Sequence, residues 1–322
     1  MAKGKGTKPI VKTKPGIKTK TSWKNALKRD WQLYLLLLIP VALVIVFCYA
    51  AYPGLSMAFM DFKPIKGFAD SDWVGMGVFK KIFHDRDFTR ALRNSIVFNL
   101  LDLLVGFPLP IILALMLNEL RFLKFKKVTQ TILYLPHFLS WAIIGSVAYF
   151  MFRPITGLVN IFLMNIGAIT EGIPFMNEKW HWAVTYLLVG VWQGMGWGTI
   201  LYLAAITSIN GELYEACIID GANKWQKMWH VTLPGIRSTI VTLLIMNLGR
   251  VMGSNLERLT SFDNTDVREF QYQLAIYIYQ KGMGAGKYSE GTAVGLFQSL
   301  VGVVLVLLSD RVAKALGEEG LL

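Results

Sequence analysis

The apolar residues of this chain are gathered into long blocks rather than into the short periodic stripes of a soluble core. A helix needs about 20 mostly apolar residues to cross a bilayer. The fourth and fifth blocks carry Gly, Asn and Trp, which favours packing against protein over exposure to lipid on all sides. The pattern predicts an all-α, polytopic membrane protein with six transmembrane helices, at 32–55, 92–118, 131–152, 181–207, 235–256 and 291–309.

The segment before the first block has a different composition. Residues 1–21 are rich in Lys, Thr, Gly and Pro and have no apolar periodicity, which predicts disorder. Residues 22–30 are expected to form a short amphipathic helix at the lipid headgroups. We therefore divide the chain into a basic, largely disordered cytoplasmic tail at 1–30 and a six-span domain at 31–322, which contains a cytoplasmic loop at 208–235.

The basic residues predict which way the helices cross the membrane. With six spans, both termini lie on the same side as the loop 208–235. Of the 33 Lys and Arg residues, 19 lie on that side, whereas the three opposite loops are longer in total and hold 13. The termini and this loop are therefore expected in the cytoplasm. The net charge of +12 follows from this bias and from a tail that touches lipid. Nucleic-acid binding would need a folded basic face with base-reading side chains, so no nucleic-acid partner is expected.

Residues that could carry catalysis or hold a metal are scattered. Cys48 lies in the first block and Cys217 in the cytoplasmic loop, so they cannot pair. The four histidines lack the spacing of a metal site. The Gly-rich run 282–288 superficially suggests a phosphate loop, but Lys281 stands where the first Gly is needed and Tyr288 replaces the Mg-binding hydroxyl. We expect no enzyme activity, metal or cofactor in this chain.

The segment between the fourth and fifth blocks is polar and forms helices. Glu215 and Ala216 favour a helix, and Gly221 lets the chain turn sharply. Pro234 suits the first turn of the following helix. The sequence therefore predicts two short helices joined at Gly221 and held on one membrane face, where they can be offered to a partner.

This segment resembles the coupling-loop motif of bacterial ATP-binding-cassette (ABC) importer permeases. The resemblance rests on the run Glu215-Ala216-Cys217-x-x-Asp220-Gly221-Ala222, followed by Leu233-Pro234. It departs only at Cys217, where the family usually has Ala. Other segments are similar to the carbohydrate-importer branch, and within it to permeases for oligosaccharides and polysaccharide fragments, including alginate-type importers: 31–34, 73–75, 118–120, 130–138 and 213–216. The resemblance covers nearly everything after about residue 30.

The resemblance implies an ABC type I importer permease fold in a bacterial cell membrane. It also implies a second permease, usually a different chain, and two cytoplasmic subunits that bind ATP and Mg. An external binding protein would deliver the sugar. Glu215 is expected to meet a basic residue of the ATPase, and Asp220 to cap the second short helix. The expected coupling residues are Tyr214, Glu215, Ala216, Asp220, Gly221 and Ala222.

The fourth span carries candidates for a substrate path. Trp192, Gln193 and Trp197 lie on it, and indole rings stack on sugar faces while amides bind hydroxyls. The same span carries a stripe of small residues, which by itself predicts close helix packing, at Gly190, Gly194 and Gly198.

Polar residues in other spans extend this path. A charge at mid-bilayer costs about 2.5–3.5 kcal/mol, so Asp102 and Arg250 are expected to face the protein interior or water. We predict that Asn247 and Arg250 line the path opposite Gln193 and the tryptophans. The competing interpretation is that Arg250 only pairs with a buried acid, such as Asp102. Asn99 is a further polar residue within a span.

Two other classes of function were compared with the importer permease. An ion-coupled secondary transporter of small polar solutes usually shows inverted repeats and buried carboxylates. Only Asp102 qualifies, and no repeat is visible. A membrane-embedded glycan enzyme would need paired acidic residues or a metal site near one face, and the sequence shows neither. The importer permease is therefore the preferred prediction.

Overall fold

The structure, a computed structural model, describes residues 27–318, 320 and 321. The predicted disorder at 1–21 and most of the expected interfacial helix lie outside these residues. The chain divides into two compact units, and the boundary in the sequence falls between Gly54 and Leu55. In the first unit, α2 (Trp31–Val44) continues into a π-helical turn, η1 (Ile45–Tyr49). Every described side chain of these two elements is exposed, as expected of a helix whose neighbours are lipid or other chains.

The second unit is built mainly from helices. A two-stranded antiparallel ribbon pairs β1 (Met60–Asp61) with β2 (Asp72–Trp73), with Met60 opposite Trp73. The long helices are α4 (Arg86–Gly106), α5 (Pro108–Asn118), α6 (Leu123–Tyr134), α9 (Lys179–Thr207), α13 (Arg237–Gly249) and α17 (Tyr288–Ala315). Shorter elements are η2 (Tyr52–Phe59), which begins in the first unit, α3 (Gly77–Phe83), η3 (Leu135–Phe138), α7 (Trp141–Phe152), α8 (Leu158–Asn165), α14 (Leu256–Ser261), η5 (Thr265–Val267), α15 (Arg268–Gln271), α16 (Leu274–Tyr277) and η6 (Ile278–Gly284).

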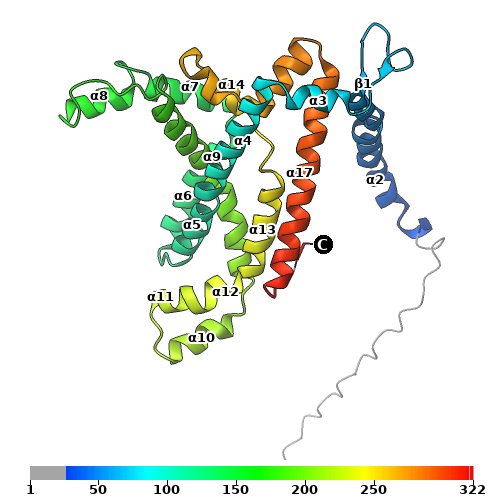
Figure 1. Cartoon of the computed structure of the whole chain (residues 1–322). Coiled ribbons are helices and arrows are strands. Elements are labelled where there is room, and N and C mark those ends of the chain that lie inside the picture. Colours follow the sequence, from blue (N-terminus) through cyan, green and yellow to red (C-terminus); the bar gives the residue numbers. More distant parts are fainter. Residues whose placement is uncertain (1–26, 319, 322) are drawn as a thin grey trace, which may run out of the picture. The chain divides into compact units, whose positions relative to one another are not determined.

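Four long helices of this unit lie side by side. They are α4, α9, α13 and α17, with α3, α7 and α14 at one end and, at the other, the loop from α10 (Gly211–Ile219) to α12 (Leu233–Gly235) (Figure 1). This arrangement confirms the predicted all-α class. Among the described residues, four helical stretches are long and apolar enough to span a membrane alone, and the count reaches the predicted six when each of two bent helix pairs is taken as one span.

The third predicted span, 131–152, is not one straight helix. It bends by 105° between Phe138 and Trp141. The reason is local: Leu139 and Ser140 are extended, and the Ser140 hydroxyl accepts a hydrogen bond from the Ile143 amide, which begins a new helix. Hydropathy measures the length of an apolar block and cannot detect such a change of direction.

The fifth predicted span, 235–256, is also different in the structure. α13 begins at Arg237, after a 58° bend, and ends at Gly249. The following residues form a tight turn in which the Gly253 amide donates to the Arg250 carbonyl at 2.8 Å. Arg250 therefore lies just beyond the end of the helix and not within one continuous helix over the predicted span 235–256.

Polar residues on α4 hold the irregular segment between α13 and α17. The Asn99 amide donates to the Val251 carbonyl at 2.8 Å and to the Gly253 carbonyl at 3.1 Å. Asn94 and Ser95 bind the same segment further along, through the carbonyls of Glu269, Phe270 and Tyr272 and the amide of Leu274. Non-helical backbone at membrane depth is tolerated where protein groups satisfy it. Asn99 therefore serves the fold.

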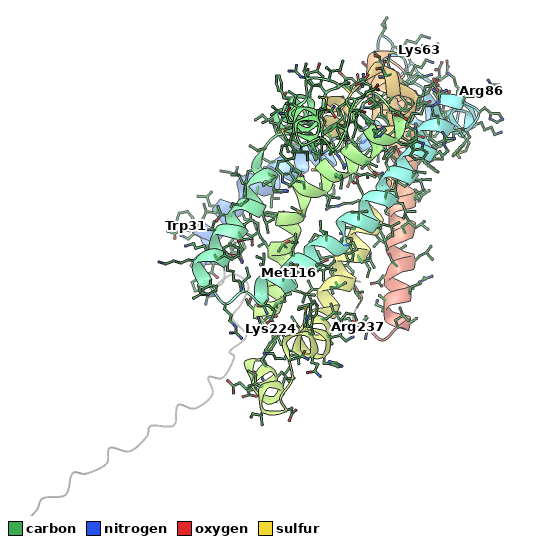
Figure 2. The ribbon with its side chains drawn as sticks, turned by 90° about the vertical axis from the view of Figure 1, so that its left-hand side faces the viewer. Trp31, Lys63, Arg86, Met116, Lys224 and Arg237 are labelled. Carbon is green, nitrogen blue, oxygen red and sulfur yellow. The ribbon has the colours of Figure 1, made fainter. Side chains whose placement is uncertain are left out.

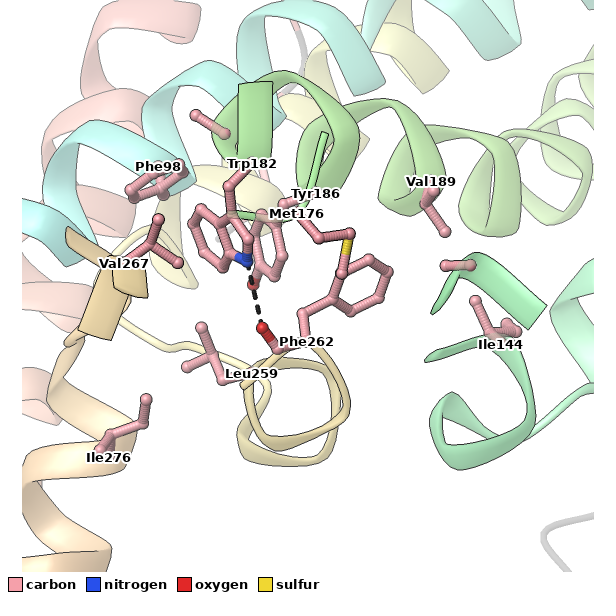
Figure 3. Packing of buried hydrophobic residues seen from close by; sticks show 12 residues of the cluster. Phe98, Ile144, Met176, Trp182, Tyr186, Val189, Leu259, Phe262, Val267 and Ile276 are labelled. Carbon is pink, nitrogen blue, oxygen red and sulfur yellow. Dashed lines mark hydrogen bonds between the residues drawn. The ribbon is translucent and has the colours of Figure 1, made fainter. Parts of the chain in front are cut away.

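The largest core cluster joins α4, α7, α9 and α14. Trp182 is fully buried and stacks on Tyr186, with 4.9 Å between ring centroids. Its indole N–H donates to the Phe262 carbonyl at 3.1 Å (Figure 3). A buried Trp needs such a partner for its N–H, so this bond fixes the segment after α14 against α9.

The closest helix contact involves Gly196, which lies outside the predicted stripe. A Cβ on Gly196 would lie 1.9 Å from the Leu133 carbonyl oxygen, so α6 and α9 can meet only at a residue without a side chain. Gly198 touches Pro110 of α5, whereas a Cβ on Gly194 would meet nothing. The small-residue stripe thus makes one helix contact, at Gly198. Gly190 instead leaves room for the Arg258 guanidinium, as described below.

Candidate functional site

The loop between α9 and α13 is a helical hairpin, as predicted. It consists of α10 (Gly211–Ile219), α11 (Lys224–Lys227), η4 (Met228–Thr232) and α12 (Leu233–Gly235). Gly221 has φ +76°. Its amide donates to the Ile218 carbonyl at 3.1 Å, and the Ala222 amide donates to the Cys217 carbonyl at 2.9 Å. This pair of bonds is a Schellman motif, which needs a left-handed residue and so favours Gly at 221.

The cap of the second helix differs from the prediction. Asp220 is the C-terminal cap of α10, and its expected role as the N-cap of the next helix is wrong. Asn223 fills that role. Its side-chain oxygen accepts from the Gln226 amide at 2.9 Å, and the Gln226 side chain accepts from the Asn223 amide at 2.7 Å. This reciprocal capping box satisfies two N–H groups of the helix start and leaves the Asp220 carboxylate outside the cap.

Some of the predicted coupling residues are exposed on the hairpin, and others hold the hairpin together. Glu215 and Ala216 are exposed, and Glu215 forms no ion pair with any described residue. The Tyr214 hydroxyl lies 3.0 Å from the Thr232 hydroxyl and ties α10 to η4. The hairpin also exposes large apolar side chains, as a docking surface does: Leu213, Ile218, Ile219, Trp225 and Trp229.

The base of the hairpin is anchored in the helical bundle. Ile236 is fully buried in a cluster with residues of α5 and α9, at the bend before α13. The Arg237 guanidinium pairs with Glu318 at 2.5 Å, which places the end of α17 beside this base. The Lys224 ammonium lies 3.3 Å from the Glu119 carbonyl oxygen, next to α5. Lys224 and Arg237 lie at the same end of this unit (Figure 2).

A cavity of about 520 Å³ lies between α4, α5, α9 and α13. The structure brings four of the predicted path residues to its lining: Asp102, Trp197, Asn247 and Arg250. Trp192 and Gln193 do not line it. Trp192 lines a separate, mainly apolar pocket between α7 and α9, so the structure does not bring Trp192 or Gln193 into this cavity.

Asp102 is paired with a residue that the sequence analysis did not single out. Arg258 of α14 makes a bidentate contact with the Asp102 carboxylate, at 2.6 and 3.2 Å. It also donates to the Tyr186 carbonyl at 2.7 Å. The guanidinium lies over the Tyr186 ring at 3.8 Å and over the Trp141 ring at 5.3 Å. Arg258 therefore joins α4, α7 and α9 to α14.

Gly190 makes room for this contact. A Cβ on Gly190 would lie 2.0 Å from a guanidinium nitrogen of Arg258. Arg258 is 156 residues from Asp102 in the chain, and it lies in a segment without an apolar block. The one available signal was the expectation that a carboxylate within a span needs a cation.

Arg250 has a different environment. It is exposed and lines the cavity, and it forms no ion pair with the residues that the structure describes. The Asn247 side chain donates to the Leu243 carbonyl of its own helix at 2.7 Å. Because Asp102 is bound to Arg258, the proposed Arg250–Asp102 pair is wrong within this chain. Arg250 is thus an uncompensated positive charge at the cavity wall.

The end of the bundle away from the hairpin carries a cluster of ion pairs. Lys81 lies 2.7 Å from the Glu290 carboxylate, and this hydrogen bond raises the pKa of the lysine. Burial raises the pKa of the Asp85 carboxyl, but hydrogen bonds from the Asp87 amide and the Tyr277 hydroxyl, together with the Lys281 ammonium, hold it below its ordinary value. The contact with Asp87 raises the pKa of Lys281. These pairs connect α3, α4, η6 and α17.

Comparison with known proteins identifies this combination of hairpin and cavity. The model of the family "Binding-protein-dependent transport system inner membrane component" matches residues 96–318, which include both features. The chain belongs to this family. Protein LplB of Bacillus subtilis (strain 168) is 41% identical over 313 residues, which cover 97% of this chain and 96% of the relative. The polygalacturonan/rhamnogalacturonan transport system permease protein YteP of the same organism is 41% identical over 290 residues, or 90% and 89% of the two chains.

Two solved structures agree with this membership. One is a bacterial ABC transporter involved in the import of the acidic polysaccharide alginate, at 36% identity and a TM-score of 0.81, with 91% of this chain and 98% of the other covered. The other is a bacterial alginate ABC transporter in complex with an alginate pentasaccharide-bound periplasmic protein, at 34% identity and a TM-score of 0.82, with 94% and 100% covered. The chain is therefore a non-enzymatic permease component of an ABC transporter, with the type I permease fold. This excludes the ion-coupled secondary transporter.

Proposed function

We propose that this chain is the permease half of an ATP-driven importer that moves an oligosaccharide through the cavity described above. An external binding protein delivers the sugar. A second permease, different from this one, completes the pathway, and two cytoplasmic subunits bind ATP and Mg and hydrolyse the nucleotide. The α10–α12 hairpin lies on the cytoplasmic side of the membrane and binds one of these subunits. Both termini of the chain lie on the same side.

One observation carries this proposal. The hairpin connects α9 directly to α13, and both helices line the cavity. Ile236, at the bend between the hairpin and α13, is fully buried against α5 and α9. Packed interiors transmit displacements because they have few voids. A pull on the hairpin therefore moves two walls of the cavity, which is what coupling of hydrolysis to transport requires.

The cavity favours an acidic oligosaccharide. YteP is named for polygalacturonan and rhamnogalacturonan, and the solved relatives for alginate, which is an acidic polysaccharide. The charged residues of the cavity lining are Asp102, Arg250 and Arg258. Asp102 and Arg258 neutralise each other, so Arg250 leaves one positive charge for the substrate. A guanidinium offers five donors in a fork that fits a carboxylate.

The test uses the complete transporter in proteoliposomes, with substrate-stimulated ATP hydrolysis and sugar uptake as readouts. Glu215→Ala removes the exposed carboxylate of α10, and we expect both readouts to fall. Glu212→Ala is the matched control, because Glu212 is an exposed acid of the same helix that binds only its neighbour Asn210. Normal stimulation in the Glu215→Ala complex would contradict the docking role. Uptake by vesicles that hold this chain alone with ATP would contradict the need for partners.

A further inference from the structure

The start of α6 carries a basic and apolar surface that the proposed function does not use. We define it as the α6 entry patch, and it consists of Arg121, Phe122, Leu123, Lys124, Phe125, Lys126 and Lys127. Phe122 is 79% exposed, Leu123 78% and Phe125 59%. Phe122 and Leu123 are among the most exposed apolar side chains of the second unit. In water such a surface would be unfavourable, so it has a partner.

Within the part of the chain that the structure describes, the four cations of the patch have no acid to balance them. None of them forms an ion pair or a side-chain hydrogen bond within the described part of the chain. The first turn of α6 has no acidic residue. Glu119, which lies two residues before Arg121, instead faces Lys224 at 3.8 Å. Like charges one turn apart repel each other, as Lys124 and Lys127 do. An anionic partner would remove this cost.

The apolar residues indicate that this partner is lipid. Phe122 and Phe125 continue along α6 into an exposed stripe through Val128 and Ile132, which are 56% and 64% exposed. The cations are confined to the end of this stripe. Aromatic rings and Lys or Arg stems at the end of a spanning helix place their charges at headgroup level. The Lys224–Glu119 contact puts this end beside the hairpin.

We propose that the α6 entry patch binds anionic phospholipid headgroups of the phosphatidylglycerol type. Each Lys or Arg near an anionic surface strengthens binding by about fivefold. α6 contacts α9 through Gly196 without an intervening side chain. Bound lipid therefore holds one wall of the cavity at a fixed depth while the hairpin moves. This proposal does not depend on which sugar is carried.

The experiment measures local lipid composition in the complete transporter, reconstituted in nanodiscs. Phe122→Cys is labelled with bimane in a complex whose other cysteines, including Cys48 and Cys217, are replaced by Ser. Spin-labelled phosphatidylglycerol or phosphatidylcholine is added at the same fraction. We expect the anionic lipid to quench the label several-fold more strongly at low salt, and this preference to shrink in 1 M salt. A label at Ile132→Cys, ~15 Å further along α6, is the control and should show no preference.

Charge variants test whether the patch itself selects the lipid. Removal of all four charges (R121Q, K124Q, K126Q and K127Q) should abolish the preference, while the charge-preserving set K124R, K126R and K127R should keep it. The second set also controls for folding. Equal quenching by both lipids in the wild type, or a preference that survives the loss of the four charges, would overturn the proposal. So would weak quenching by both lipids, because it would mean that protein, such as an ATPase subunit, covers the patch.

Discussion

Replacing each of the two arginines at the cavity by methionine should have a different effect. Arg258 is 9% exposed and Arg250 is exposed. Arg258→Met removes the cation that holds Asp102, the Tyr186 carbonyl and two aromatic rings. Arg250→Met removes a cation that binds none of the described residues. We expect the first variant to lose stability and the second to lose transport.

The structure sets the size of the first effect. Removing one partner of a buried ion pair costs about 3–5 kcal/mol. The Asp102 side chain is 26% exposed toward the cavity, so water eases the cost of leaving it without its partner. The loss of the contact with the Tyr186 ring adds about 1–2 kcal/mol. We therefore expect a destabilisation of about 3 kcal/mol. Arg250→Met should change stability by less than about 0.5 kcal/mol, as exposed substitutions do.

The assay is thermal unfolding of the purified complex, followed by intrinsic fluorescence, with basal ATP hydrolysis and sugar uptake measured in parallel. About 3 kcal/mol corresponds to a midpoint roughly 6–12 °C lower for Arg258→Met. The Arg250→Met complex should assemble and hydrolyse ATP at the basal rate but transport poorly, and acidic sugars should suffer more than neutral ones.

A double variant isolates the ion pair. Asp102→Asn combined with Arg258→Met removes both charges, so it should recover about 1 kcal/mol or more of the loss expected from adding the single effects. If Arg258→Met unfolds at the wild-type midpoint, the assignment of Arg258 as the link between four helices is wrong. If Arg250→Met prevents assembly, Arg250 is structural and its place in the substrate path is wrong.

Three further perturbations have defined outcomes. Gly221→Leu should destabilise the hairpin locally by about 1–2 kcal/mol through its left-handed backbone alone, since an added Cβ meets nothing. We expect lower stimulated ATP hydrolysis while the unfolding midpoint of the spans stays unchanged, and wild-type hydrolysis would contradict this. Gly196→Ala should destabilise the complex by about 1–3 kcal/mol, because its Cβ meets the backbone of α6. Gly194→Ala is the control and should be neutral or slightly stabilising. Equal unfolding midpoints for the two variants would refute the close approach of α6 and α9. The Lys281–Asp85 pair contributes its full stability between pH ~4 and pH ~10. Above pH ~4, Asp85 is charged in both the folded and the unfolded chain. Above pH ~10, Lys281 begins to lose its proton in the unfolded chain. Lys281→Gln should therefore lower the unfolding midpoint at pH 7, and its difference from the wild type should shrink as the pH falls below ~4; a difference independent of pH would show that the pair contributes through packing.

The sequence by itself determined the features that depend on local chemistry. A block of about 20 apolar residues must form a helix in a bilayer, because the backbone has no water to bind. The all-α class and four of the spans follow from this rule alone. Gly221 was predictable for a similar reason, since a left-handed residue between two short helices favours Gly. The family motif around it then identified the hairpin from residues that are close in the chain.

The tertiary structure decided how distant polar groups are paired. Asp102 was recognised as a charge that needs a partner, but the choice of Arg258 over Arg250 depends on where α14 packs. Asn99 was recognised only as a polar residue within a span, and the structure shows that it binds the turn after α13. The 105° bend at Ser140 likewise divides the third predicted span into two helices, and the apolar composition of the span does not predict it. Burial makes an unsatisfied polar group costly wherever it lies, so the sequence predicts that a partner exists. Only the packing of helices brings one particular partner within hydrogen-bond distance, because that distance depends on segments more than a hundred residues apart.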